Sequence, residues 1–203
     1  KEMKINFNLI KPRIGFIINN YFMSILAIAS GQVDKIVVAP LLGFSILGNY
    51  SLAVQAVNIM LILPSVFYKY LLPQESTGVK NKKPKIIIVI FSIFITVFGI
   101  FVVPALINEF FPKFDQAVDA IRIMSIVVIP TTVSLIFESE FLGNEKSRIV
   151  VIGTVIVLSS LIIGMIVLGS LMGIEGIAYS LVIANTAKVG FYLIVKKFST
   201  NIL

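Results

Sequence analysis

The chain has no cysteine, no histidine and no tryptophan among its 203 residues. Without cysteine there is no disulfide and no thiol chemistry, and without histidine the commonest general base and metal ligand is missing. We therefore expect neither an enzyme nor a metal or cofactor site. Tyrosine must provide the aromatic belt that anchors membrane proteins at the lipid–water interface, because tryptophan is absent. Charged residues make up only 13% of the chain, about half the share that is typical of soluble domains.

Apolar side chains are in excess: 58% of the residues are hydrophobic and the mean hydropathy is +1.02. Soluble domains are nearer half apolar, so the composition predicts an all-α membrane protein whose surroundings are membrane lipids. The net charge of +7 does not indicate a nucleic-acid partner. The cations lie at the ends of apolar stretches, where anionic lipid headgroups meet them.

Six apolar stretches are long enough to cross a hydrocarbon core of roughly 30 Å as helices. They cover residues 14–42, 47–72, 86–106, 117–142, 149–168 and 174–195. Lysine and arginine cluster before the first stretch, in alternate connections and in the C-terminal tail. Because positive loops stay in the cytoplasm, this alternation predicts six spans in the cell membrane with both termini cytoplasmic. The chain starts at Lys1 rather than methionine, and we expect it to be a piece of a longer protein.

Polar and small side chains follow one face of the first span. They project within roughly 100° of one another on a helical wheel, and they are Asn20, Ser24, Ala27, Gly31, Asp34 and Lys35. The second span repeats the pattern within roughly 80°, and its members are Ser51, Gln55, Asn58, Ser65 and Lys69. Two adjacent polar stripes predict a shared polar cavity.

The remaining spans carry signals for packing rather than for a cavity. The third and fifth spans are the most apolar and are expected to face lipid. Gly153, Ser160 and Gly164 of the fifth span form a narrow strip that lets a neighbouring helix approach closely. Prolines within or near span ends predict kinks, and they are Pro40, Pro64, Pro104 and Pro130.

Ionisable side chains inside spans are candidate substrate contacts, because a charge in a bilayer is costly and usually faces a bundle interior. Lys188 shares a polar face of the sixth span with Asn185 and Tyr192. Two interpretations of Lys188 stay open. Its ammonium either faces the interior or reaches along the span to the cytoplasmic interface.

Asp34 and Lys35 also have two interpretations, since they either line the cavity or close the first span. The run that follows them is too apolar for a loop, which favours the cavity. Arg122 is a third candidate cation, with a local salt bridge to Asp119 as the alternative. The carboxylates of Glu138 and Glu140 are expected to pair with the cations of residues 146–148 at the cytoplasmic end.

The order of several short motifs resembles a known family of membrane proteins. Asp34 and Lys35 are followed by an apolar run to Leu42-Gly43, and then by Leu47-Gly48-Asn49-Tyr50-Ser51-Leu52-Ala53. Further pieces in the same order are Pro73 with Ser76, Phe111-Pro112 with Phe114 and Ala117, Leu142-Gly143, and Gly173-Ile174-Glu175-Gly176-Ile177-Ala178. The chain resembles the C-terminal half of polysaccharide-transport flippases of the multidrug/oligosaccharidyl-lipid/polysaccharide exporter superfamily.

The resemblance implies one six-helix lobe of a twelve-helix transporter, whose partner is the missing N-terminal lobe. Such a flippase moves an isoprenoid-diphosphate-linked oligosaccharide from the cytoplasmic to the outer leaflet. Lys35, Lys188 and Arg122 are then the cations available for the diphosphate or for acidic sugars. The neutral and acidic candidates around them are Asp34, Asn20, Ser24, Gln55, Asn58 and Asn185.

Three other functions compete with this one. A drug/cation antiporter of the same superfamily has the same lobe but needs a buried carboxylate for coupling, for which Asp34 is the deep candidate. A membrane glycosyltransferase needs a sizeable catalytic loop, and the connection 73–85 offers lysines and only one glutamate. A structural membrane subunit, with its polar stripes packed against partner helices, remains the third alternative.

Overall fold

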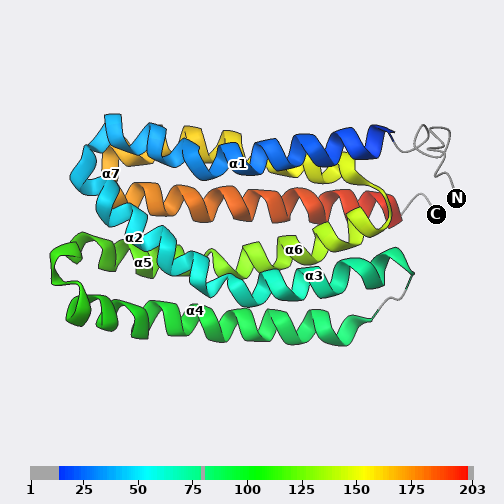
Figure 1. The fold of residues 1–203 in the computed structure, drawn as a ribbon, viewed down its shortest axis with the longest axis horizontal. Coiled ribbons are helices and arrows are strands. Elements are labelled where there is room, and N and C mark those ends of the chain that lie inside the picture. Colours follow the sequence, from blue (N-terminus) through cyan, green and yellow to red (C-terminus); the bar gives the residue numbers. More distant parts are fainter. Residues whose placement is uncertain (1–13, 79–80, 201–203) are drawn as a thin grey trace, which may run out of the picture.

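The computed structural model describes residues 14–78 and 81–200, and every regular element in these ranges is a helix. The elements are α1 (Ile14–Leu42), α2 (Phe44–Met60), α3 (Ile62–Ser76), α4 (Lys82–Phe110), the 3-10 helix η3 (Pro112–Phe114), α5 (Asp115–Ser125), α6 (Val128–Gly143) and α7 (Ser147–Thr200). They pack side by side in an elongated bundle (Figure 1). The all-helical prediction is therefore confirmed for the described part of the chain.

Length and apolarity identify the helices that can cross a membrane. Among the described residues, Lys82–Phe110 and Ser147–Phe198 meet both criteria. The pairs α2–α3 and α5–α6 add two more if each bent pair counts as one span. Residues 14–78 and 81–200 thus contain between two and four candidate spans, which supports a membrane protein.

Two of the predicted spans are broken near their middle. The α2–α3 pair bends by 44° at Leu61, and the α5–α6 pair bends by 44° after Ser125. Pro64 and Pro130 explain the positions, because proline has no N–H to donate to the carbonyl four residues earlier. The carbonyls released are those of Met60 and Ile126, which lie at the two breaks. The kink predictions for Pro64 and Pro130 are confirmed, whereas α4 continues through Pro104 as one helix.

The long element α7 doubles back on itself at Gly173, so that residues 147–172 and 174–200 form two antiparallel arms (Figure 1). Gly173 has φ +61 and ψ −134, a backbone conformation that only glycine adopts without strain. A Cβ at position 153 would meet the Tyr192 hydroxyl at 2.5 Å, and one at position 164 would meet Ser180 Cβ at 2.8 Å. These contacts confirm Gly153 and Gly164 as packing positions.

Replacing Gly176 by alanine is expected to open this hairpin. A Cβ at position 176 would lie 1.9 Å from the Leu168 carbonyl oxygen, and backbone cannot move aside as a flexible side chain can. We expect the free energy of unfolding to fall by about 1–3 kcal/mol, as in other overpacked sites. Unfolding of the purified variant in detergent measures the loss.

Gly190→Ala is the matched control on the same arm, since nothing lies within 4 Å of a Cβ there. This substitution is expected to leave stability unchanged or raise it by up to about 1 kcal/mol, because alanine favours helix. Equal stability of the two variants would refute the close approach at Gly176.

The two ends of the bundle differ in charge. One end of the bundle holds the first residues of α1, α4 and α7 and the last residues of α3, α6 and α7 (Figure 1). The lysines and arginine of residues 82–85, 146–148 and 196–197 belong to these helix ends. The turns at Gly43, Phe111 and Gly173 lie at the opposite end (Figure 1). The structure thus gathers the cationic connections on one side, in the arrangement from which the topology was predicted.

Ion pairs tie the helices together at the cationic end. Glu75 of α3 is buried and pairs with Lys85 of α4, with 2.5 Å between Oε1 and Nζ. Glu140 of α6 pairs with Lys196 of α7 at 2.8 Å and lies 3.9 Å from Lys85. Four helices are therefore linked through one network. Glu140 was predicted to pair with the cations of residues 146–148, but it meets Lys196 and Lys85 instead, because helices distant in sequence come together here.

α4 presents most of its side chains to the outside. Its buried face holds Ser92, Thr96 and Gly99, and the two hydroxyls donate to carbonyl oxygens within the helix. A Cβ at Gly99 would meet Ser125 Oγ at 2.6 Å and Met60 at 2.7 Å. The exposed side is apolar, with Ile90 at 61% and Phe94 at 66% exposure. This pattern agrees with the predicted lipid-facing third span.

Asn49 fixes α2 against the start of α5. Its side chain is buried, and its Oδ1 accepts a hydrogen bond of 3.2 Å from the Ala117 backbone N–H. Its Nδ2 donates to the Ser45 carbonyl oxygen. The first amides of a helix have no partner within the helix, so Asn49 caps α5 from a neighbouring element. Part of the Gly48-Asn49-Tyr50 motif is thereby explained by packing.

Candidate substrate cavity

A cavity of about 520 Å³ lies between α1, α2, the α5–α6 pair and both arms of α7. Leu61 at the first helix break and Val127 at the second are among its lining residues. Broken helices in a membrane expose backbone polar groups, which are tolerated only inside protein or beside a cavity. The cavity and the two breaks therefore belong to one structural feature.

Polar side chains from four elements converge on the cavity. They are Lys35 of α1, Ser51, Gln55 and Asn58 of α2, Thr131 of α6, and Asn185 of α7. The Thr131 hydroxyl donates to Asn185 Oδ1 at 3.4 Å, which links α6 to α7 across the wall. The structure thus brings together one end of the stripe of the first span, Ser51, Gln55 and Asn58 of the second, and Asn185 of the sixth. Ser65 and Lys69 of the predicted second stripe are not among the lining residues, because they follow the break at Leu61.

The rest of the wall is apolar. Tyr50, Val54, Met124, Val157 and Leu161 contribute to it. Val157 and Leu161 lie in the predicted fifth span, which was expected to face lipid. That expectation is wrong for Val157 and Leu161. An apolar helix face can pack at a cavity wall as well as against lipid, and the sequence does not distinguish the two.

Lys35 is the only cation that lines the cavity among the described residues. Its side chain is exposed, and its Nζ lies 3.5 Å from Gln32 Oε1. An exposed lysine at a cavity wall is a candidate contact for an anionic ligand. Asp34 lies beside it in α1, but its side chain falls outside the described part of the structure.

Asn20 and Ser24 do not line the cavity. Asn20 Nδ2 donates to the Phe16 carbonyl oxygen at 2.9 Å, and the Ser24 hydroxyl donates to the Asn20 carbonyl oxygen at 3.0 Å. Both groups thus have partners on their own helix. Asn20 also precedes Lys35 by about 22 Å of helix, at 1.5 Å per residue.

Arg122 lies away from the cavity wall and forms a local ion pair. Its guanidinium NH1 is 2.9 Å from Asp119 Oδ1, and both side chains are more than half exposed. The alternative interpretation given for Arg122, a salt bridge one turn long on α5, is the one that the structure contains. Such exposed pairs contribute about 0–1 kcal/mol.

Lys188 forms a buried ion pair with Glu138 of α6, and each side chain is 13% exposed. The Tyr192 hydroxyl donates to Glu138 Oε1 at 3.3 Å, and Lys188 Nζ lies 5.7 Å from the centre of the Tyr192 ring. Lys188 is not among the lining residues, although Asn185 one turn earlier is. Its charge is therefore balanced within the protein.

The sequence interpretation missed this pair. It assigned Glu138 to the cations of residues 146–148 and left Lys188 without a carboxylate partner. The two residues are 50 positions apart, and no local spacing rule connects them. A charge inside a span does signal a compensating charge elsewhere, which is the one sequence feature that points to such a pair.

The structure is that of a helical membrane protein with a cavity between its helices, and two of the polar residues that line this cavity, Gln55 and Asn58, are exposed. No family model, no curated protein and no solved structure matches this chain. The class therefore rests on the helices and the cavity themselves.

Proposed function

We propose that this chain is the C-terminal lobe of a flippase that moves a lipid-linked oligosaccharide from the cytoplasmic to the outer leaflet. The six spans are α1, the α2–α3 pair, α4, the α5–α6 pair and the two arms of α7. α1 begins and α7 ends at the cationic end of the bundle, which is the cytoplasmic side in this proposal. The N-terminal lobe, supplied by the remainder of a longer protein, covers the open side of the cavity.

One observation carries the proposal: a polar cavity with a single described cation at the level of two broken helices. Discontinuous helices that line a central site are typical of transporters, in which one bundle moves against another around a fixed binding site. The bends at Pro64 and Pro130 supply the two elements whose angle can change. A membrane subunit that only packs against partners has no need of aligned breaks.

The chemistry of the substrate fits the lining. A diphosphate with a sugar chain cannot enter hydrocarbon unless other groups replace its hydration. Gln55, Asn58 and Asn185 offer amide donors and acceptors for sugar hydroxyls, and Lys35 offers a positive charge for phosphate or an acidic sugar. The isoprenoid tail remains in the bilayer. We propose Lys35 as the anion contact because it lines the cavity, whereas Lys188 does not.

Thiol labelling tests whether the cavity contains water. The chain has no cysteine, so single cysteines at positions 55 and 58 can be labelled without background. They are expected to react with small hydrophilic maleimides in membranes, whereas a cysteine at position 94 on the apolar side of α4 is expected to stay protected. Protection at 55 and 58 equal to that at 94 would favour a packed, non-transporting subunit.

A further inference from the structure

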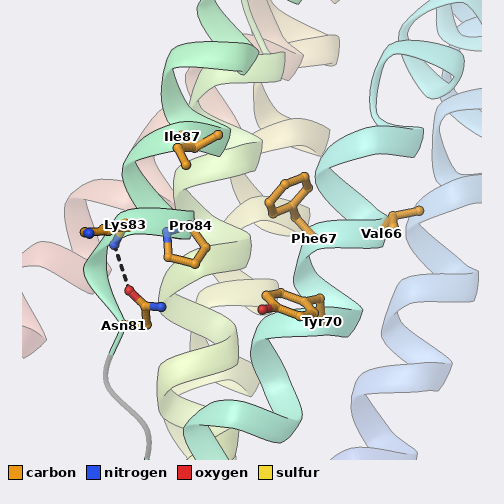
Figure 2. A pocket seen from close by; sticks show the side chains of 7 residues that line it. All are labelled: Val66, Phe67, Tyr70, Asn81, Lys83, Pro84 and Ile87. Carbon is orange, nitrogen blue, oxygen red and sulfur yellow. Dashed lines mark hydrogen bonds between the residues drawn. The ribbon is translucent and has the colours of Figure 1, made fainter.

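A second cavity lies outside the bundle core, between α3 and α4 at the cationic end, with a volume of about 470 Å³. Phe67 and Tyr70 of α3 lie on the side toward Pro84 and Ile87 of α4 (Figure 2), and Val66 also contributes to the lining. Val66, Tyr70 and Ile87 are each 54% exposed, so this groove is open along its length. It shares no lining residue with the substrate cavity.

The groove has a polar end and an apolar end. At the polar end, Asn81 Oδ1 accepts a hydrogen bond from the Lys83 backbone N–H, which turns the amide nitrogen of Asn81 toward Tyr70 (Figure 2). The Tyr70 hydroxyl also points toward Asn81 (Figure 2). Neither the Asn81 amide nitrogen nor this hydroxyl has a hydrogen-bond partner among the described residues. Two donors therefore converge on one spot.

The apolar end lies one helical turn deeper. Phe67 precedes Tyr70 on α3, and Ile87 follows Lys83 on α4 by about 6 Å of helix. Both side chains line the groove toward the middle of the bundle (Figure 2). A ligand that fills this space must combine a hydrogen-bond acceptor with a hydrocarbon chain.

The surrounding charge selects an anionic acceptor. Lys82 and Lys83 at the start of α4 are exposed, and so is Lys69 beside Tyr70. Lys85 is neutralised by Glu75 and adds no net charge. Each lysine near the membrane surface at the end of a helix strengthens the binding of anionic lipid roughly fivefold.

We propose that this groove is a binding site for one anionic membrane phospholipid. Its phosphate accepts hydrogen bonds from Tyr70 and Asn81, the exposed lysines Lys69, Lys82 and Lys83 around this end of the bundle attract its negative charge, and one acyl chain lies along Phe67 and Ile87. A free phosphate ion would occupy only the polar end and leave the hydrocarbon part unfilled. The proposal depends on the protein lying in a membrane and is independent of the transported substrate.

Tryptophan fluorescence measures phospholipid binding in the groove directly, because the chain has no tryptophan of its own. Phe67→Trp places a reporter in the groove, and Phe94→Trp places one on the exposed apolar side of α4. The full chain is reconstituted with bilayers in which brominated phosphatidylglycerol or brominated phosphatidylcholine quenches the reporter on contact. The readout is the ratio of the apparent affinity for phosphatidylglycerol to that for phosphatidylcholine. We expect this ratio to be about five or more at position 67 and near one at position 94.

Substitutions in the Phe67→Trp background assign the preference to the site. Lys83→Gln and the pair Tyr70→Phe with Asn81→Ala are expected to bring the ratio toward one. Lys113→Gln, which removes an exposed lysine of η3, is expected to leave it unchanged. Circular dichroism of each variant verifies that the helices are intact. A ratio near one at position 67, or a ratio that the groove substitutions leave intact, would overturn the proposal.

Discussion

Replacing Lys188 alone by methionine is expected to lower the free energy of unfolding by about 3–5 kcal/mol, the cost of breaking a buried ion pair. The substitution leaves the Glu138 carboxylate, whose side chain is only 13% exposed, without its cationic partner. Among the described residues, the Tyr192 hydroxyl is then the remaining hydrogen-bond donor to this carboxylate. Unfolding of the purified protein in mixed detergent measures the change.

Removing both charges is expected to restore most of the loss. In the double variant Glu138→Leu/Lys188→Met no unpaired charge remains, and replacing a buried pair by apolar groups is often neutral. Lys196→Met is the matched control, because it breaks an ion pair between the same two helices at the exposed end. It is expected to cost only about 0–1 kcal/mol. A loss at Lys188 as small as that at Lys196 would contradict the buried pair.

The same double variant separates structure from transport. If Lys188 serves only to balance Glu138, the double variant exports glycan when it is present at normal protein levels. Failure of export in a stable double variant would return Lys188 to the set of anion contacts. The distinction matters because a single Lys188 variant loses stability under either role.

Replacing Lys35 by glutamine is expected to reduce glycan export by roughly tenfold, which corresponds to about 1.4 kcal/mol, near the low end for a hydrogen bond to a charged group. The experiment requires the complete protein in cells, with surface glycan and intracellular lipid-linked repeat units as the readouts. Lys35→Arg is expected to retain more export because it keeps the cation. Lipid-linked units are expected to accumulate inside in the glutamine variant.

The control for Lys35 is Lys113→Gln, which removes an equal charge at an exposed position outside the cavity. It is expected to export normally. Normal export by Lys35→Gln at wild-type protein levels would remove Lys35 as the anion site. The uncharged residues Gln55, Asn58 and Asn185 would then carry substrate binding.

The sequence predicted features that local rules govern. Pro64 and Pro130 break helices because each lacks a backbone donor, whatever surrounds them. Gly153 and Gly164 admit a neighbouring helix because they have no side chain. Gln55 and Asn58 share a face by helical periodicity alone. These features needed no knowledge of which helices are neighbours.

Other features depend on partners distant in sequence, and these were not predicted. Glu138 meets Lys188 only because α6 packs beside the second arm of α7. Asn20 differs, because its partner is local: it was expected in the cavity, but its amide donates to the Phe16 carbonyl oxygen of its own helix. Polarity alone does not distinguish such a contact from a ligand contact. Val157 lines the cavity although its neighbourhood in sequence is as apolar as a lipid-facing helix.

Photo-cross-linking from inside the cavity tests the proposed substrate most directly. A photoreactive phenylalanine analogue is placed at position 58 in the wall or at position 94 on the exposed side of α4, within the complete protein in cells. Illumination of the protein with the analogue at position 58 is expected to yield an adduct in which the mass added to the protein is that of an isoprenoid-diphosphate-linked glycan. No such adduct is expected from position 94. Absence of the adduct at 58, or equal amounts from both positions, would contradict a flippase cavity at this site.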